Sequence, residues 1–177
     1  MNSKSEQAST AFINLLKNPV KFRLYLLSHL PSAFFSGISL RHVDEQVCAV
    51  SVPYKWMTKN PFRSTYFACL SMAAEMSTGV LCLLHLYKRN PPVSMLVVKV
   101  ESEFFKKATD QTTFLCNDGL MIKETIELAV QSGGAKMIRT KSVGTNKNGV
   151  PIAEFFVTRS FKVRSASVSR ASQQSIV

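Results

Sequence analysis

The sequence has few of the cysteines and histidines that make metal and redox centres, and it lacks the motif of a serine nucleophile. Its 177 residues include four cysteines, at spacings that fit neither a zinc site nor a redox pair, and three scattered histidines. No Gly-x-Ser-x-Gly elbow occurs, so a serine nucleophile has no support. The cysteines lie within apolar runs, and we expect buried, reduced thiols. We therefore expect no metal and no cofactor.

Acidic residues are also scarce, since 11 Asp and Glu stand against 22 Lys and Arg, a formal charge of +11. Such a surface attracts anions, which leaves nucleic acid, anionic membrane or a phosphorylated small molecule as partners. The basic residues are dispersed as far as Arg159 and Arg164, without a dense run or the interleaved aromatic pattern typical of RNA binding. We expect no nucleic acid partner, although charge-driven peripheral binding to nucleic acid or membrane stays open as an alternative.

The chain starts with a polar segment, residues 1–10, that lacks a basic start followed by an apolar run. No secretory signal is visible there, and we expect a cytoplasmic protein. The composition, 46% hydrophobic and 19% charged, provides enough apolar material for one substantial core. We expect an N-terminal helical extension over residues 1–30, one domain over 31–164, and a disordered Ser-rich tail over 165–177.

Apolar periodicity and turn residues predict the order of elements. The N-terminal extension should hold one or two helices broken at Asn18-Pro19. Strands are expected at 38–43, 46–57, 93–105, 112–116, 136–143 and 152–163, and helices at 60–87 and 120–131. The second helix is expected to be capped by Asp118 and closed by Gly133. This order predicts an α+β fold, in which an antiparallel sheet wraps around a long central helix.

The predicted helix over 60–87 is nearly all apolar but carries one acid, Glu75. About 20 apolar residues can cross a bilayer, but an acid in mid-span costs about 3 kcal/mol, so we expect no stable membrane insertion. A lone carboxylate in an apolar setting needs either a structural partner or a chemical role. Asn60, a serine or a backbone donor could be that partner, and Arg63 could pair with Glu75 only between subunits.

The segments Lys59 to Ala68 and Met72 to Gly79 resemble the hotdog-fold thioesterase superfamily, and within it the uncharacterised DUF4442 branch. The resemblance extends over about Leu30 to Arg164. Members of the superfamily carry an Asn before the central helix, a His-Gly-Gly at its start, and an Asp or Glu on its second to third turn. Asn60 and Glu75 stand at the Asn and acid positions. Tyr66 stands at the His position, and Phe67 and Ala68 replace the two glycines.

The resemblance implies a hotdog fold and hydrolysis of an acyl-coenzyme A or acyl carrier protein thioester by a homodimer or a dimer of dimers. Glu75 would be the base or nucleophile, and Asn60 would orient water or the carbonyl. The backbone N–H groups of Phe67 and Ala68 would bind the oxyanion. Substrate contacts are expected from Tyr66 and Arg63. The coenzyme phosphates would have five basic candidates: Lys88, Arg89, Lys106, Lys107 and Arg139.

Each of these roles has a structural alternative. Asn60 could be a helix cap, and Tyr66 and Phe67 could be ordinary core residues. The side chains that replace the glycines narrow the approach of a thioester to the helix start. A non-catalytic acyl or acyl-coenzyme A binding protein with the same groove is therefore the main alternative to an enzyme.

Overall fold

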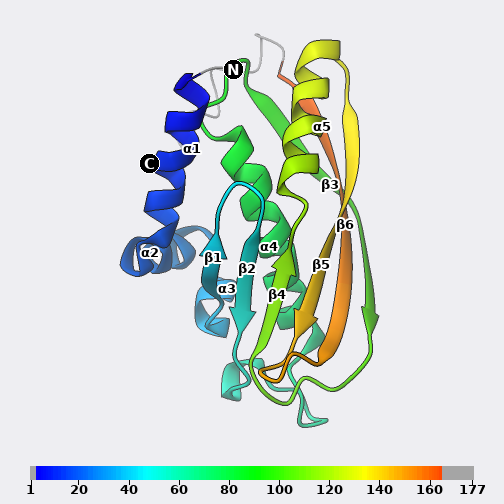
Figure 1. Ribbon diagram of the computed structural model, residues 1–177. Helices are drawn as coiled ribbons and strands as arrows, with labels where there is room; N and C mark the ends of the chain where they lie inside the picture. The colour runs from blue at the N-terminus through cyan, green and yellow to red at the C-terminus, as the bar shows by residue number, and fades with distance from the viewer. Residues whose placement is uncertain (1–2, 165–177) are drawn as a thin grey trace.

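The computed structural model describes residues 3–164, with side chains from residue 10 onward, so the predicted tail lies outside the described residues (Figure 1). A curved sheet encloses the long helix α4 (Phe67–Leu86), and the N-terminal helices lie on the side of α4 that the sheet leaves open. The other helical elements are α1 (Ser3–Lys17), α2 (Pro19–His29), α3 (Pro31–Ser36), η1 (Trp56–Thr58) and α5 (Gly119–Ser132). The strands are β1 (Ser39–Val43), β2 (Cys48–Val52), β3 (Val93–Phe104), β4 (Thr112–Cys116), β5 (Lys136–Thr145) and β6 (Pro151–Val163).

The six strands form one antiparallel sheet in the order β1-β2-β4-β5-β6-β3. The predicted α+β architecture, a sheet wrapped around a central helix, is confirmed. Strand β2 is shorter than predicted, because the chain leaves the sheet at Pro53, which has no N–H to donate to the ladder, and then forms η1. Strand β3 is twelve residues long and lies at an edge of the sheet.

Helix α4 begins at Phe67, not at Asn60 as predicted. The preceding residues form a loop because the amide oxygen of Asn60 accepts hydrogen bonds from the N–H groups of Phe62 and Ser64. The alternative role of Asn60 as a helix cap is therefore wrong, since the N-cap residue is Tyr66, which makes no side-chain cap bond. Residues before Pro favour extended or turn conformations, and Asn60-Pro61 fits such a turn as well as a helix start.

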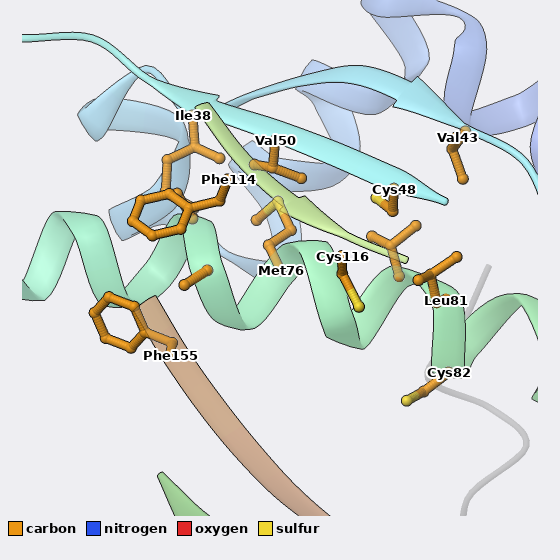
Figure 2. Close-up of a cluster of buried hydrophobic side chains, with 14 of the residues drawn as sticks. Ile38, Val43, Cys48, Val50, Met76, Leu81, Cys82, Phe114, Cys116 and Phe155 are labelled. Carbon is orange, nitrogen blue, oxygen red and sulfur yellow. The ribbon is translucent and has the colours of Figure 1, made fainter. Parts of the chain in front are cut away.

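The core lies between the inner face of α4 and the sheet. Figure 2 shows Met76 of α4 beside Val50 and Phe114 of the strands. Leu81 of α4 and Phe155 of β6 belong to the same buried cluster. Helix α4 is long and apolar enough to cross a membrane, but 67% of that stretch is buried inside the protein, as expected of a core helix. The prediction of buried, reduced thiols is confirmed for the four cysteines: Cys48, Cys69, Cys82 and Cys116.

The predicted break at Asn18-Pro19 separates α1 from α2. The side chain of Asn18 accepts hydrogen bonds from Val20 N and Lys21 N, which caps α2. The later helix α5 ends at Gly133, which has a φ of 64°, as predicted. Asp118 differs from its prediction, because its carboxylate accepts the N–H of Lys141 on β5 and makes no cap bond to α5.

Candidate functional site

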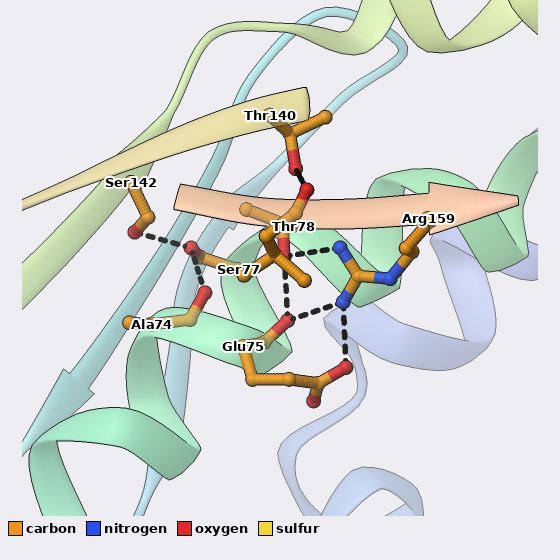
Figure 3. Close-up of polar contacts among 8 residues, drawn as sticks. Ala74, Glu75, Ser77, Thr78, Thr140, Ser142 and Arg159 are labelled. Atoms are coloured by element: carbon orange, nitrogen blue, oxygen red, sulfur yellow. Dashed lines mark hydrogen bonds and ion pairs between the residues drawn. The ribbon is translucent and has the colours of Figure 1, made fainter. Parts of the chain in front are cut away.

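Glu75 and Arg159 form an ion pair in the middle of α4 (Figure 3). Arg159 Nη2 on β6 lies 2.6 Å from Glu75 Oε1. The side chain of Arg159 is 0% exposed, whereas that of Glu75 is 47% exposed. The partners proposed for Glu75 from the sequence, Asn60 and Arg63, are therefore replaced by a buried arginine 84 positions away in the chain.

The guanidinium of Arg159 also binds the helix backbone at Glu75. Its Nη2 donates to the carbonyl oxygen of Glu75 at 3.3 Å, and its Nη1 donates to Thr78 Oγ1 at 2.7 Å. The hydroxyl of Thr78 in turn donates to the same carbonyl at 2.9 Å. Arg159 thus holds both the main chain and the carboxylate of Glu75, so the acid has a fixed position on the helix.

Gly79 makes room for this ion pair one turn further along α4. A Cβ atom at position 79 would lie 3.1 Å from Glu75 Oε1 and 3.3 Å from Arg159 Nη2. Both distances are shorter than ordinary van der Waals contacts. The absence of a side chain at Gly79 therefore lets the guanidinium reach the carboxylate.

Sequence reasoning missed Arg159, which we counted among the dispersed basic residues. A signal was present in the alternation of β6, where Phe155, Val157 and Phe161 all point inward. Arg159 is in phase with these residues, and side chains two apart on a strand share a face. A cation at an inward position of a strand predicts a buried charge with a partner in the core.

The carboxylate of Glu75 lies at the wall of an apolar pocket, which we call the α1/α2 pocket. Its lining comes from α1 and α2 through Phe12, Leu15 and Tyr25, and from α4 through Glu75 and Leu83. Arg159 engages Oε1 of Glu75, while Oε2 has no hydrogen-bond partner among residues 10–164. One carboxylate oxygen is therefore available to water or to a ligand in the pocket.

A second hollow, the loop groove, lies at the start of α4. Its lining includes Asn60, Tyr66 and Phe67 together with Lys106 and Lys107 after β3. The rings of Tyr66 and Phe67 meet edge to face at 4.9 Å and are 46% and 56% exposed, so they are not core residues. The first N–H groups of a helix have no acceptor within it, so the amides of Phe67 and Ala68 can bind an anion.

The structure separates the predicted site into these two hollows within one chain. Glu75 lines the α1/α2 pocket, whereas Asn60 and Phe67 line the loop groove. Eight residues at about 1.5 Å each place Phe67 about 12 Å from Glu75 along the helix. The side chain of Asn60 is already engaged within its own loop, where it also accepts from Ser64 Oγ at 3.2 Å.

The five basic residues predicted to bind phosphates are also divided. Lys106 and Lys107 line the loop groove. Arg89, beyond the far end of α4 and next to Lys88, pairs with Glu127 at 2.7 Å. Arg139 pairs with Glu101 at 3.0 Å and stacks on a ring of β6. Arg63 occupies the loop before α4 with a φ of 58°.

A metal centre does not emerge from the described side chains. Within residues 10–164, no group of three or more His, Cys, Asp and Glu side chains could hold a metal ion. His85 is buried and its Nε2 lies 3.1 Å from the carbonyl oxygen of Glu45. Burial lowers the pKa of His85, so the neutral ring is the form that suits this site.

Comparison with known proteins finds similarity in structure only. No protein-family model matches the chain, and no curated protein matches it in sequence. A Pseudomonas aeruginosa protein of unknown function, named as a probable thioesterase, is 17% identical with a TM-score of 0.69, over 82% of this chain and 97% of that one. A Chlorobaculum tepidum protein of unknown function is 15% identical with a TM-score of 0.69, over 82% and 97%. A Haemophilus influenzae thioesterase is 11% identical with a TM-score of 0.54, over 79% and 88%. These similarities confirm the hotdog fold.

Proposed function

We propose that the protein hydrolyses acyl thioesters and that Glu75 is its base or nucleophile. The observation that carries the proposal is a half-exposed carboxylate, held by a fully buried arginine, at the wall of an apolar pocket. An apolar pocket suits an acyl chain, and a carboxylate fixed at its wall suits attack on the carbonyl of that chain. The thioesterases among the structural neighbours support this proposal. We also propose that the protein belongs to the DUF4442 branch and that it is cytoplasmic.

The reaction needs few groups. Glu75 Oε2 takes a proton from water as the water oxygen attacks the thioester carbon, and the negative charge moves to the carbonyl oxygen. The N–H groups of Phe67 and Ala68 stabilise that oxyanion. When the tetrahedral intermediate collapses, the C–S bond breaks and the sulfur leaves with the proton that Glu75 held. The products are a carboxylic acid and a thiol.

These groups can meet only if two chains contribute them, since one chain separates them along α4. We propose a homodimer, alone or as a dimer of dimers, in which the Asn60 loop of one subunit approaches Glu75 of the other. Strand β3 supports this arrangement, because it is an edge strand that exposes Leu96, Val98 and Val100 by 66%, 52% and 50%. A long apolar edge with unpaired backbone groups is a template for pairing with a second copy.

The thiol carrier would be coenzyme A or an acyl carrier protein. Lys106 and Lys107 are the best placed of the five predicted basic residues, because they lie in the loop groove beside Tyr66 and Phe67. Neither lysine pairs with an acid among residues 10–164, whereas Arg89 and Arg139 already do. A phosphate group could therefore bind Lys106 and Lys107 without breaking an ion pair.

A non-catalytic acyl-binding protein is the second candidate, and one observation favours it. The side chain of Phe67 occupies the helix start where a glycine would leave the backbone open, and it lines the loop groove. This ring could prevent a thioester carbonyl from reaching the amides while the apolar pocket still binds the acyl chain.

Thiol release from acyl-coenzyme A esters, from acetyl to stearoyl, tests the proposal with the wild type and Glu75→Gln. We expect turnover of at least one ester by the wild type and a decrease of about 100-fold or more in Glu75→Gln. Glu45→Gln is the matched control, because Glu45 makes a half-exposed pair with Lys123, lines neither hollow and lies outside β3, so this variant should keep full turnover. Turnover retained in Glu75→Gln would rule out its role. Thermal stabilisation by an ester without thiol release would establish the binding protein instead.

A further inference from the structure

One end of the molecule exposes large apolar side chains that do not pack into the core. Trp56 and Met57 of η1 are 76% and 50% exposed, and Phe62 in the loop before α4 is 75% exposed. In Figure 1 this part of the chain lies at the lower end, beyond the ends of the strands. We call Trp56, Met57 and Phe62 the apolar tip. They protrude from turns, so they line neither the α1/α2 pocket nor the interior.

Local hydrogen bonds hold the apolar tip in place. Thr58 Oγ1 accepts the N–H of Lys55 at 2.9 Å and donates to the carbonyl of Pro53 at 2.7 Å, which closes the turn that presents Trp56 and Met57. The amide oxygen of Asn60 accepts the N–H of Phe62 at 3.0 Å. A bridge between Lys59 and Thr65 closes the base of the second loop. The exposure of the tip is therefore built into the turns.

Basic residues surround the apolar tip. Lys55, Lys59 and Arg63 alternate with it along the chain, and Lys106 and Lys107 lie in the neighbouring loop after β3. All five are exposed, and within residues 10–164 none of them forms a salt bridge. Residues 53–68 include no acid. This end of the protein is thus apolar at its tip and positive around it.

We propose that this end of the protein docks on the surface of an anionic lipid bilayer. Trp56, Met57 and Phe62 enter the boundary between headgroups and acyl chains, and the surrounding lysines and arginine lie at the level of the lipid phosphates. Side chains that protrude singly from turns fit a fluid interface better than a shaped protein groove, and tryptophan is favoured at such interfaces. The docking extends beyond thioester hydrolysis and does not depend on it.

Docking would also place the loop groove at the membrane. Phe62 belongs both to the apolar tip and to the lining of that groove, next to Tyr66 and Phe67. A single-chain amphiphile leaving the bilayer would meet the groove directly, with its apolar part against aromatic rings and its anionic part near Lys106. The apolar tip therefore connects a source of acyl chains with the helix start.

Trp56 gives the test a built-in probe, because it is the single tryptophan of the chain. The full-length protein is mixed with vesicles of equal parts phosphatidylcholine and phosphatidylglycerol, or of phosphatidylcholine alone. We expect cosedimentation with the anionic vesicles, weakening steeply with added salt, and a blue shift of Trp56 emission on binding. Brominated lipid in the anionic vesicles should quench that emission.

Two variants and two matched controls separate docking from general adsorption of a basic protein. Phe62→Ser removes apolar area from the tip, and Lys59→Glu reverses one of the charges that surround it. Each should lower binding at least about 5-fold. The controls Leu128→Ser on α5 and Lys162→Glu on β6 make the same changes at exposed positions elsewhere and should bind like the wild type. Thermal unfolding verifies that each variant is folded.

Several outcomes would overturn the docking proposal. One is no binding to anionic vesicles at low salt, and another is binding that Lys162→Glu lowers as much as Lys59→Glu does. Emission of Trp56 that is already blue-shifted without vesicles would show that a second copy covers the tip. Emission that responds to duplex DNA and not to vesicles would assign the surface to nucleic acid. Thiol release is measured without vesicles, so loss of docking and loss of turnover are distinguishable results.

Discussion

Removing Glu75 should destabilise the protein more than removing Arg159, although the two side chains form one ion pair. Glu75→Ala leaves the guanidinium of Arg159, which is 0% exposed, without a counter-ion. Arg159→Met leaves a carboxylate whose side chain is 47% exposed, so water can solvate it. The penalty for a lone buried charge applies to the first variant and is mostly avoided in the second.

The structure sets the size of each effect. An uncompensated buried charge costs about 3 to 5 kcal/mol, and the lower value applies because Arg159 keeps its bonds to Thr78 Oγ1 and the carbonyl of residue 75. For Arg159→Met the lost charge-assisted bonds are offset by burial of an apolar side chain, which leaves a cost of about 1 kcal/mol. If the doubly substituted protein loses about 1 to 2 kcal/mol, the coupling energy between the two side chains is about 2 to 3 kcal/mol.

Urea unfolding at one protein concentration and neutral pH measures all three variants beside the wild type. For a chain of this size, about 3 kcal/mol lowers the midpoint of thermal unfolding by about 6 to 12 °C. The reference variant Glu101→Ala breaks exposed pairs with Lys99 and Arg139 and should leave the unfolding midpoint close to that of the wild type. A cost for Arg159→Met equal to or above that for Glu75→Ala would refute the argument, since it would show that the guanidinium is not the group that depends on its partner.

Three further predictions concern buried groups elsewhere in the protein. Gly144→Ala places a Cβ 2.5 Å from the ring of Phe114, so urea unfolding should show a loss of about 1 to 3 kcal/mol. Burial lowers the pKa of His85, so the stability that its neutral ring contributes is complete above about pH 6.5 and is lost as the pH falls through the lower pKa of the folded protein. His85→Gln should make the free energy of unfolding less dependent on pH in this range, as measured by urea unfolding at several pH values. Burial raises the pKa values of the thiols of Cys48, Cys82 and Cys116. A chromogenic disulfide should therefore label these three thiols only after unfolding, and they should add little background to a thiol-release assay.

Most elements of the fold could be predicted from local patterns. The alternation of β4 and of the β5/β6 hairpin is a property of neighbouring residues, and their predicted bounds agree with the structure to within two residues. The predicted start of α4 was wrong, because Asn60-Pro61 is compatible both with a helix start and with a turn. Hydrogen bonds from Phe62 N and Ser64 N to the Asn60 side chain stabilise the turn, and the sequence pattern does not predict these bonds.

The candidate site was less predictable, because its geometry depends on register between distant segments. Glu75 could be singled out as an acid in an apolar helix, but its partner depends on which residue of β6 faces α4. The strand alternation predicts that Arg159 points inward without saying what it meets. The division of the predicted residues between two hollows was also beyond the sequence, since spacing along α4 does not show which elements cover each turn.

A chemical role for the Glu75 and Arg159 pair can be separated from a structural one. Replacing a buried ion pair by apolar residues of similar volume is often neutral or stabilising, so stability alone gives little reason for this pair. We therefore expect Glu75→Leu combined with Arg159→Met to unfold within about 1 kcal/mol of the wild type and to release no thiol from any ester that the wild type hydrolyses. If the pair only supports the fold, a folded double variant would keep its turnover. An inactive double variant that is as stable as the wild type would show that the carboxylate is present for the reaction and the arginine for the carboxylate.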